Sequence, residues 1–149
     1  MKRILRRDFF ISLFWKQNDW HKHGVLVHTL RVVQECIKAK RYDFIPAAIF
    51  HDIGKPFVAY QDESDKLKGT YSFHNHEEIS FQIIKRWPFL SDKTKSLVRY
   101  HYLLRAIMKT QEKGQVAKNV YYIKKLERQS DSFKQDLKIF QKIDDIAKD

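Results

Sequence analysis

Along most of the chain, apolar residues recur every three or four positions, which is the spacing of an amphipathic helix. No stretch sustains the alternation of apolar and polar residues that marks a half-buried strand. The sequence therefore predicts an all-α fold of about six or seven helices, forming a single domain over residues 1–149. The segments with the helical pattern are residues 5–17, 25–41, 44–51, 75–87, 92–101, 116–127 and 132–148.

Local signals predict where several of these helices begin and end. Asp43 and Ser91 precede apolar helical segments and can cap them. Gly54 can take the left-handed conformation that ends a helix, and Pro56 cannot continue one. Residues 57–73 are polar and predict a loop without regular structure. Two interpretations of this loop remain open, a lid over a substrate and a plain connection.

Composition narrows the class of protein. The chain has 149 residues, of which 43% are hydrophobic, enough for one core. Its single cysteine, Cys36, lies on an apolar helical face and indicates a buried thiol in a reducing compartment. A short apolar run follows basic residues at the start, but Asp8 interrupts it and no cleavage signal follows. No stretch approaches the length of a membrane span, so we expect a cytoplasmic protein without a membrane partner.

The net charge of +11 predicts attraction to anions such as nucleotides, RNA or DNA. The basic residues are spread along the chain and form no compact tract. A surface that binds polyanions and a merely solvated lysine-rich surface therefore both remain open.

Candidate chemistry centres on His51 and Asp52, which stand together at the end of an apolar helical segment. Burying an unpaired carboxylate there would be costly, so Asp52 needs a strong partner. Adjacent imidazole and carboxylate groups can bind one divalent cation. A metal ion is the simplest partner for the pair.

Further candidate ligands lie on predicted inward faces. His28 belongs to the apolar face of residues 25–41, and His101 lies near the end of residues 92–101. Asp144 continues an apolar stripe at spacings of four, three and four. Two pairs leave a choice between neighbours: His74 with His76, and Asp144 with Asp145.

This series of residues, from His28 through His51-Asp52-Ile-Gly-Lys to the Asp144-Asp145-Ile-Ala segment, resembles the HD superfamily of metal-dependent phosphohydrolases. The resemblance implies that His28, His51, Asp52 and Asp144 hold a first metal. Asp144 is preferred to Asp145 because the family pattern is an aspartate with a small residue three positions later.

The two-metal phosphodiesterase branches of the superfamily have two extra histidines, to which His76 and His101 are similar. Asp52 would then bridge two metals about 3.5–4 Å apart. His76 is preferred to His74 because a glutamate follows it, as in the similar HD domains of tRNA nucleotidyltransferases. The donors suit one or two ions of Mn, Fe, Co, Ni, Zn or Mg, without choosing between them.

The resemblance also implies roles in substrate binding and proton transfer. Lys55 would contact the substrate phosphate. In the alternative interpretation, Lys55 is a helix C-terminal cation that interacts only with the helix dipole. Arg105 is a candidate phosphate-binding residue, and His21 is a candidate general acid. Catalysis would thus involve Asp52, Lys55 and His21.

The function expected from these residues is that of a metal-dependent phosphohydrolase, in the simplest case a phosphodiesterase. Its substrate would be the phosphate ester of a nucleotide or nucleic acid, cleaved by a metal-activated water. Nucleotidase activity is also open. A different class remains as the alternative: a basic RNA- or DNA-binding module whose metal is structural or vestigial, with aromatics and cations interleaved near Tyr121 and Lys124. The sequence does not determine the oligomeric state.

Overall fold

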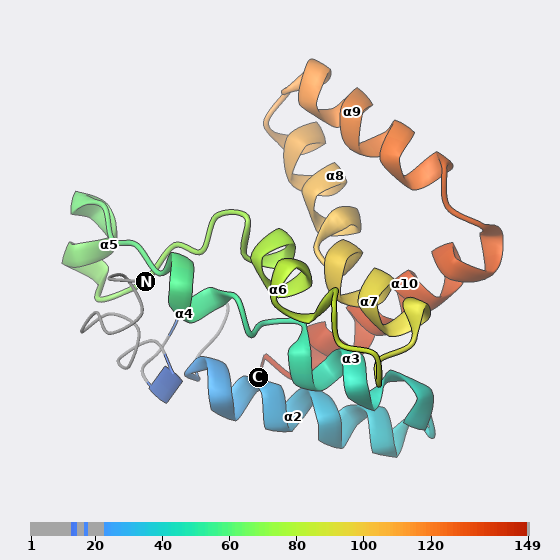
Figure 1. Ribbon diagram of the computed structural model, residues 1–149. Helices are drawn as coiled ribbons and strands as arrows, with labels where there is room; N and C mark the ends of the chain where they lie inside the picture. Colours follow the sequence, from blue (N-terminus) through green and yellow to red (C-terminus); the bar gives the residue numbers. More distant parts are fainter. Residues whose placement is uncertain (1–12, 15–16, 18–22, 149) are drawn as a thin grey trace.

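The structure is a computed structural model and describes residues 13–14, 17 and 23–148. Within these residues the regular structure is helical, apart from an isolated bridge between Tyr60 and Ser72, so the all-α prediction is confirmed. None of the described helices is long and apolar enough to cross a membrane. Most of the first predicted helix, and His21, lie outside the described residues. The elements in order are α2 (Val25–Lys38), the 3-10 helix η1 (Tyr42–Phe44), α3 (Ile45–Phe50), α4 (Lys55–Val58), α5 (Glu63–Lys68), α6 (His76–Ile84), α7 (Asp92–Tyr100), α8 (Leu103–Glu112), α9 (Val116–Glu127) and α10 (Asp131–Ile146) (Figure 1).

The apolar core lies where α2, α3, α7 and α10 pack together. Val32 of α2, Leu97 of α7 and Phe140 of α10 have almost no exposed surface. Burying each such side chain contributes about 1.5–3 kcal/mol of transfer free energy. The Phe140 ring also packs edge-on against the ring of His51, with centroids 5.8 Å apart. The core therefore extends directly to the first of the candidate ligands.

The expected loop at residues 57–73 contains regular structure, so that part of the prediction is wrong. Helix α4 extends into it, and α5 lies inside it. Helix α5 begins with a capping box in which Asp62 and Asp65 each accept a hydrogen bond from the other's backbone N–H. It ends at Gly69, whose φ of 62° favours glycine. Local capping thus makes a short helix out of a polar sequence without an apolar face.

Gly54 is required for a different reason from the predicted one. Its φ of −77° is right-handed, so it does not end a helix as a left-handed residue. A Cβ at Gly54 would lie 2.5 Å from the His76 carbonyl oxygen and 2.7 Å from the Ser80 nitrogen. The glycine therefore lets the turn after α3 pack against α6. Pro56 occupies the first turn of α4, where its missing N–H leaves no helical hydrogen bond unmade.

The segment around His101 bends instead of continuing as one helix. Ser91 caps α7 by accepting a hydrogen bond from the Thr94 N–H, as predicted. The chain then turns at His101 and Tyr102, and α8 starts in a new direction. Helices α8 and α9 pack on each other and form a hairpin that projects from the rest of the chain (Figure 1).

Asp43 does not cap a helix, contrary to the prediction; it belongs to a network of ion pairs over Phe44. Both its carboxylate oxygens accept hydrogen bonds from Arg41, at 2.9 Å. Arg41 and Lys93 each also bind Asp136 of α10 at 2.8 Å. Burial would raise the pKa of Asp136, but the hydrogen bonds from Lys93 and Arg41 lower it below its usual value. The network ties α7, η1 and α10 together.

We expect Asp136→Asn to lower the free energy of unfolding by about 1 kcal/mol at neutral pH, because two cations lose their shared partner. A folded-state pKa below the unfolded value stabilises the protein above about pH 4, and this contribution is lost as the pH falls through the folded pKa. The difference in melting temperature from wild type should therefore be largest near pH 7 and shrink below pH 4.

The matched control is Glu63→Gln, because the Glu63 side chain is 90% exposed and, among the described residues, pairs only with Lys66 of its own helix. This variant should melt within about 1 °C of wild type. Equal melting temperatures for both variants across the pH range would show that the network does not stabilise the fold.

Candidate metal centre

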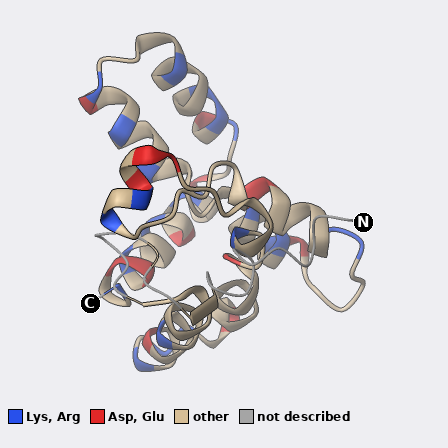
Figure 2. Ribbon diagram, turned by 90° about the vertical axis from the view of Figure 1, so that its left-hand side faces the viewer, with Lys and Arg blue, Asp and Glu red and all other residues tan. Residues whose placement is uncertain are grey.

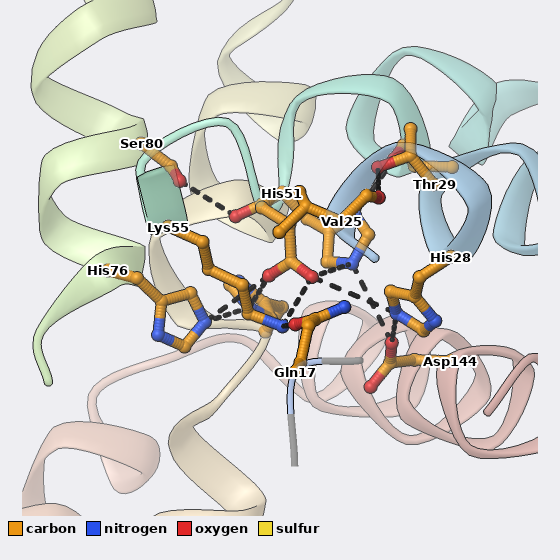
Figure 3. Close-up of polar contacts among 12 residues, drawn as sticks. Gln17, Val25, His28, Thr29, His51, Lys55, His76, Ser80 and Asp144 are labelled. Carbon is orange, nitrogen blue, oxygen red and sulfur yellow. Dashed lines mark hydrogen bonds and ion pairs between the residues drawn. The ribbon is translucent and has the colours of Figure 1, made fainter. Parts of the chain in front are cut away.

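Six buried side chains from five parts of the chain converge on one site. Figure 3 labels four of them, His28, His51, His76 and Asp144. They form two groups, and within each group the potential ligand atoms lie within 4.8 Å of one another. One group is His28, His51 and Asp144; the other is Asp52, His76 and His101. These are the six residues predicted from the sequence as metal ligands.

The local backbone orients three of the histidine rings. His51 and His101 lie in the turns that follow α3 and α7, and His76 is the first residue of α6. In each, Nδ1 lies 2.7–2.9 Å from the carbonyl oxygen three residues earlier. A carbonyl can only accept, so Nδ1 carries a hydrogen in all three rings, and Nε2 is the nitrogen that can give its lone pair to a cation in place of a proton. All three Nε2 atoms are thus left as potential ligands, in the manner of metal-binding histidines.

Asp52 links the two groups, with one oxygen toward each. Its Oδ2 lies 3.2 Å from His51 Nε2 and 3.8 Å from His28 Nε2. Its Oδ1 lies 3.3 Å from His76 Nε2 and 3.7 Å from His101 Nε2. This is the arrangement needed for a carboxylate that bridges two neighbouring cations.

Asp144 completes the first group from α10. Its Oδ1 lies 2.8 Å from His28 Nε2 and 3.6 Å from His51 Nε2. Asp144 is buried, whereas the side chain of Asp145 is 47% exposed and faces Arg105 and Lys148. The geometry favours Asp144 over its neighbour, and likewise His76, which is buried, over His74, which is exposed.

The donor set fits a bound cation. Nε2 of His76 and Nε2 of His101 lie 3.1 Å apart, and both carry lone pairs when their Nδ1 atoms donate to carbonyls. Two acceptors at this distance repel each other, and a cation between them would turn the repulsion into shared coordination. Both Asp52 oxygens are buried, and neither accepts a hydrogen bond of regular geometry. Mixed imidazole and carboxylate donors suit first-row divalent metals.

The charged side chains of the centre shift one another's pKa values. Burial lowers the pKa of His51, but the charges of Asp52 and Asp144 outweigh burial and raise it to about 10. Burial alone would raise the pKa of Asp52, but His51 and Lys55 hold it well below its usual range. Burial would also raise the pKa of Asp144, but hydrogen bonds with His28 and His51 hold it well below its usual range, so both carboxylates are ionised at neutral pH and attract cations.

Lys55 lies inside the same cluster. Its Nζ is 2.6 Å from Asp52 Oδ2 and donates a hydrogen bond of 2.8 Å to the Oε1 of Gln17. The side chain is only 6% exposed, and the residue opens α4, so it does not offset a helix C-terminus as the alternative interpretation held. The structure thus places the Lys55 ammonium beside the candidate ligands, where a substrate phosphate could meet both.

Arg105 reaches the cluster from α8. Its Nη2 lies 3.2 Å from Asp144 Oδ2 and also binds Asp145. The predicted phosphate-binding arginine is thus paired with carboxylates at the edge of the centre. Its role toward a phosphate stays a prediction.

A family model described as the HD domain matches residues 25–147, most of the chain. The chain belongs to the HD domain family. Members of this family are in general metal-dependent phosphohydrolases, and the centre of this HD domain has two groups of histidine and aspartate that could hold a metal ion. The branch within the family stays a prediction. No curated protein and no solved structure matches the chain.

Sequence reasoning missed two buried residues that support the centre of this HD domain. Ser80 accepts a hydrogen bond from the Gly54 N–H and donates one to the His51 carbonyl, at 2.9 and 2.8 Å. Its position four residues after His76, on the same buried face of α6, could have indicated an inward role. Gln17 had no such signal, because its partner Lys55 lies 38 residues away in the sequence.

We expect Ser80→Ala to lower the free energy of unfolding by about 1–3 kcal/mol, because it leaves two buried backbone groups of the turn between His51 and Gly54 unpaired. Urea denaturation measures this change. The matched control is Ser96→Ala, a half-buried serine inside α7 without a side-chain hydrogen bond among the described residues. It should be neutral or slightly stabilising, since alanine favours a helix. A similar effect of both substitutions would contradict the bracing role of Ser80.

Proposed function

We propose that this HD domain is a divalent-metal-dependent phosphohydrolase, and most simply a phosphodiesterase acting on the phosphate ester of a nucleotide or nucleic acid. The observation that carries the proposal is the pair of buried ligand groups joined by Asp52.

We infer two cation subsites. His28, His51 and Asp144 would hold one ion and His76 and His101 the other, with one oxygen of Asp52 for each. Each subsite then has few protein ligands for metals that commonly take six, and positions remain for water and substrate. Structural metal sites are instead closed by protein ligands. This difference favours an enzyme over a binding module with a structural metal.

When bound, divalent ions at such a pair of subsites lower the pKa of a water and polarise a phosphoryl oxygen. The chain's residues would orient that chemistry. The three carbonyl-bound imidazole rings hold their Nε2 atoms in place, so little reorganisation is needed during reaction. Burial of the six side chains keeps bulk water from weakening their electrostatic effect.

Lys55 would bind the phosphate and stabilise the charge that develops on it. Its ammonium lies 2.6 Å from Asp52 Oδ2, so a phosphate held by both subsites would be within its reach. Arg105 would stabilise the same developing charge from the side of Asp144, provided that the phosphate competes with Asp144 for the guanidinium. The assignment of His21 as general acid stays a prediction, since the residue lies outside the described residues.

The proposal is tested by hydrolysis of a chromogenic phosphodiester and of a phosphomonoester with Mn²⁺, for wild type and Asp52→Asn. We expect wild type to cleave the diester. The variant should cleave it more than about a hundredfold more slowly. Cleavage of the monoester alone would indicate a nucleotidase. An active Asp52→Asn variant would exclude the proposed mechanism.

Metal content tests the two subsites separately from activity. We expect about two equivalents of Mn²⁺ bound to wild type by equilibrium dialysis, and about one to His76→Ala, because the second subsite loses a ligand while the first stays intact. The matched control is His74→Ala, which removes an exposed histidine two residues away. It should keep the wild-type content. Equal loss from both variants would contradict the assignment of His76.

A further inference from the structure

The α8–α9 hairpin carries an excess of positive charge. Residues 103–128 contain seven lysines and arginines and two glutamates. Figure 2 shows more basic than acidic positions on these two helices, and Figure 1 shows that the hairpin projects from the remainder of the chain. No residue of α9 is buried. The hairpin is therefore a basic, solvent-facing arm.

A row of residues on one face of α8, and on the turn before it, runs from the candidate metal centre toward the tip of this arm. We call Tyr102, Arg105, Lys109 and Lys113 the α8 stripe. Spacings of three, four and four place them on one side of the helix. Lys109 Nζ donates a 2.9 Å hydrogen bond to the Tyr102 hydroxyl, and both Arg105 and Lys109 lie within 6 Å of the Tyr102 ring. These contacts confirm that the first three side chains share a face.

The inner end of the α8 stripe touches both halves of the centre. The Tyr102 ring contacts the His76 ring, with centroids 5.7 Å apart. Arg105 binds Asp144 of the other ligand group. An anion lying along the stripe would therefore end at the candidate metal ligands.

The outer end carries charge that is free to bind an anion. Within the described part of the chain, neither Lys109 nor Lys113 pairs with a carboxylate, and both side chains are exposed. Successive basic residues of the stripe are about 6 Å apart along the helix axis, comparable to successive phosphates of an extended strand. On α9, Tyr121 is 61% exposed and offers a ring for stacking.

We propose that the α8 stripe binds the backbone of single-stranded nucleic acid and leads its end to the metal centre. Charge complementarity selects a polyanion, and the exposed ring of Tyr121 suits an unpaired base. The six ligand residues are at most 7% exposed, so the thin end of a single strand suits this centre better than the width of a duplex. Delivery of an ester to the centre rests on the proposed phosphohydrolase function; binding to the stripe does not.

The test measures fluorescence anisotropy of a labelled single-stranded 12-mer oligonucleotide with Asp52→Asn protein in EDTA, so that neither metal nor hydrolysis contributes. In this background, Lys109→Glu with Lys113→Glu reverses two charges of the α8 stripe. The matched control, Lys66→Glu with Lys68→Glu, makes the same change of net charge on α5, at a distance from the hairpin (Figure 1). Thermal melting establishes that both double variants are folded.

We expect the stripe variant to bind at least about tenfold more weakly than its parent. The slope of log affinity against log salt should fall in magnitude by about 1.4, since each phosphate contact to a single strand contributes about 0.7. The control should stay within about twofold. Equal losses in both variants would show that only net charge matters, and a duplex bound as tightly as the single strand would also overturn the proposal.

The assay separates this inference from the proposed function. Stripe-dependent binding by a protein whose wild type cleaves no phosphate ester would support the α8 stripe and refute the hydrolase. Cleavage of small esters by a wild type that binds no oligonucleotide would support the hydrolase and refute the stripe.

Discussion

The burial of Asp52 is the constraint on which the rest of this structure depends. An ionised carboxylate inside an apolar fold is costly unless other groups compensate it, and here imidazoles surround both its oxygens while Lys55 lies 2.6 Å away. Those partners come from helices far apart in the sequence. The fold must therefore bring α2, α6, α7 and α10 to one point around the turn after α3.

The need to gather these partners around Asp52 explains several local details of the fold. Gly54 allows the turn to approach α6 within a distance that a side chain would forbid. Ser80 satisfies the two backbone groups of that turn. The break between α7 and α8 directs the His101 ring inward and sends the following helix outward. A single bend thus supplies a ligand to the centre and the base of the basic arm.

The centre and the arm are also linked electrostatically. The carboxylates at the centre attract cations and hold Arg105 at its edge, whereas the exposed lysines beyond it repel cations and attract phosphates. In the proposed function, a substrate with a phosphate backbone would gain free energy at the arm directly, and at the centre only through cations bound by the carboxylates. The ion-pair network around Arg41 and Asp136 includes none of the six candidate ligands.

The sequence alone determined the helical class and the inward positions of His28 and Asp144, because helical periodicity is local and records which face is buried. The resemblance to the HD superfamily chose His76 over His74 and assigned His76 and His101 to a second metal, and the structure brings all six residues together. Only the tertiary structure decided that Gly54 is needed for close packing and that Gln17 holds Lys55, and the structure also revealed the helix that local capping forms within residues 57–73. Each of these depends on neighbours distant in sequence or on capping bonds between polar side chains, which hydrophobic periodicity does not record.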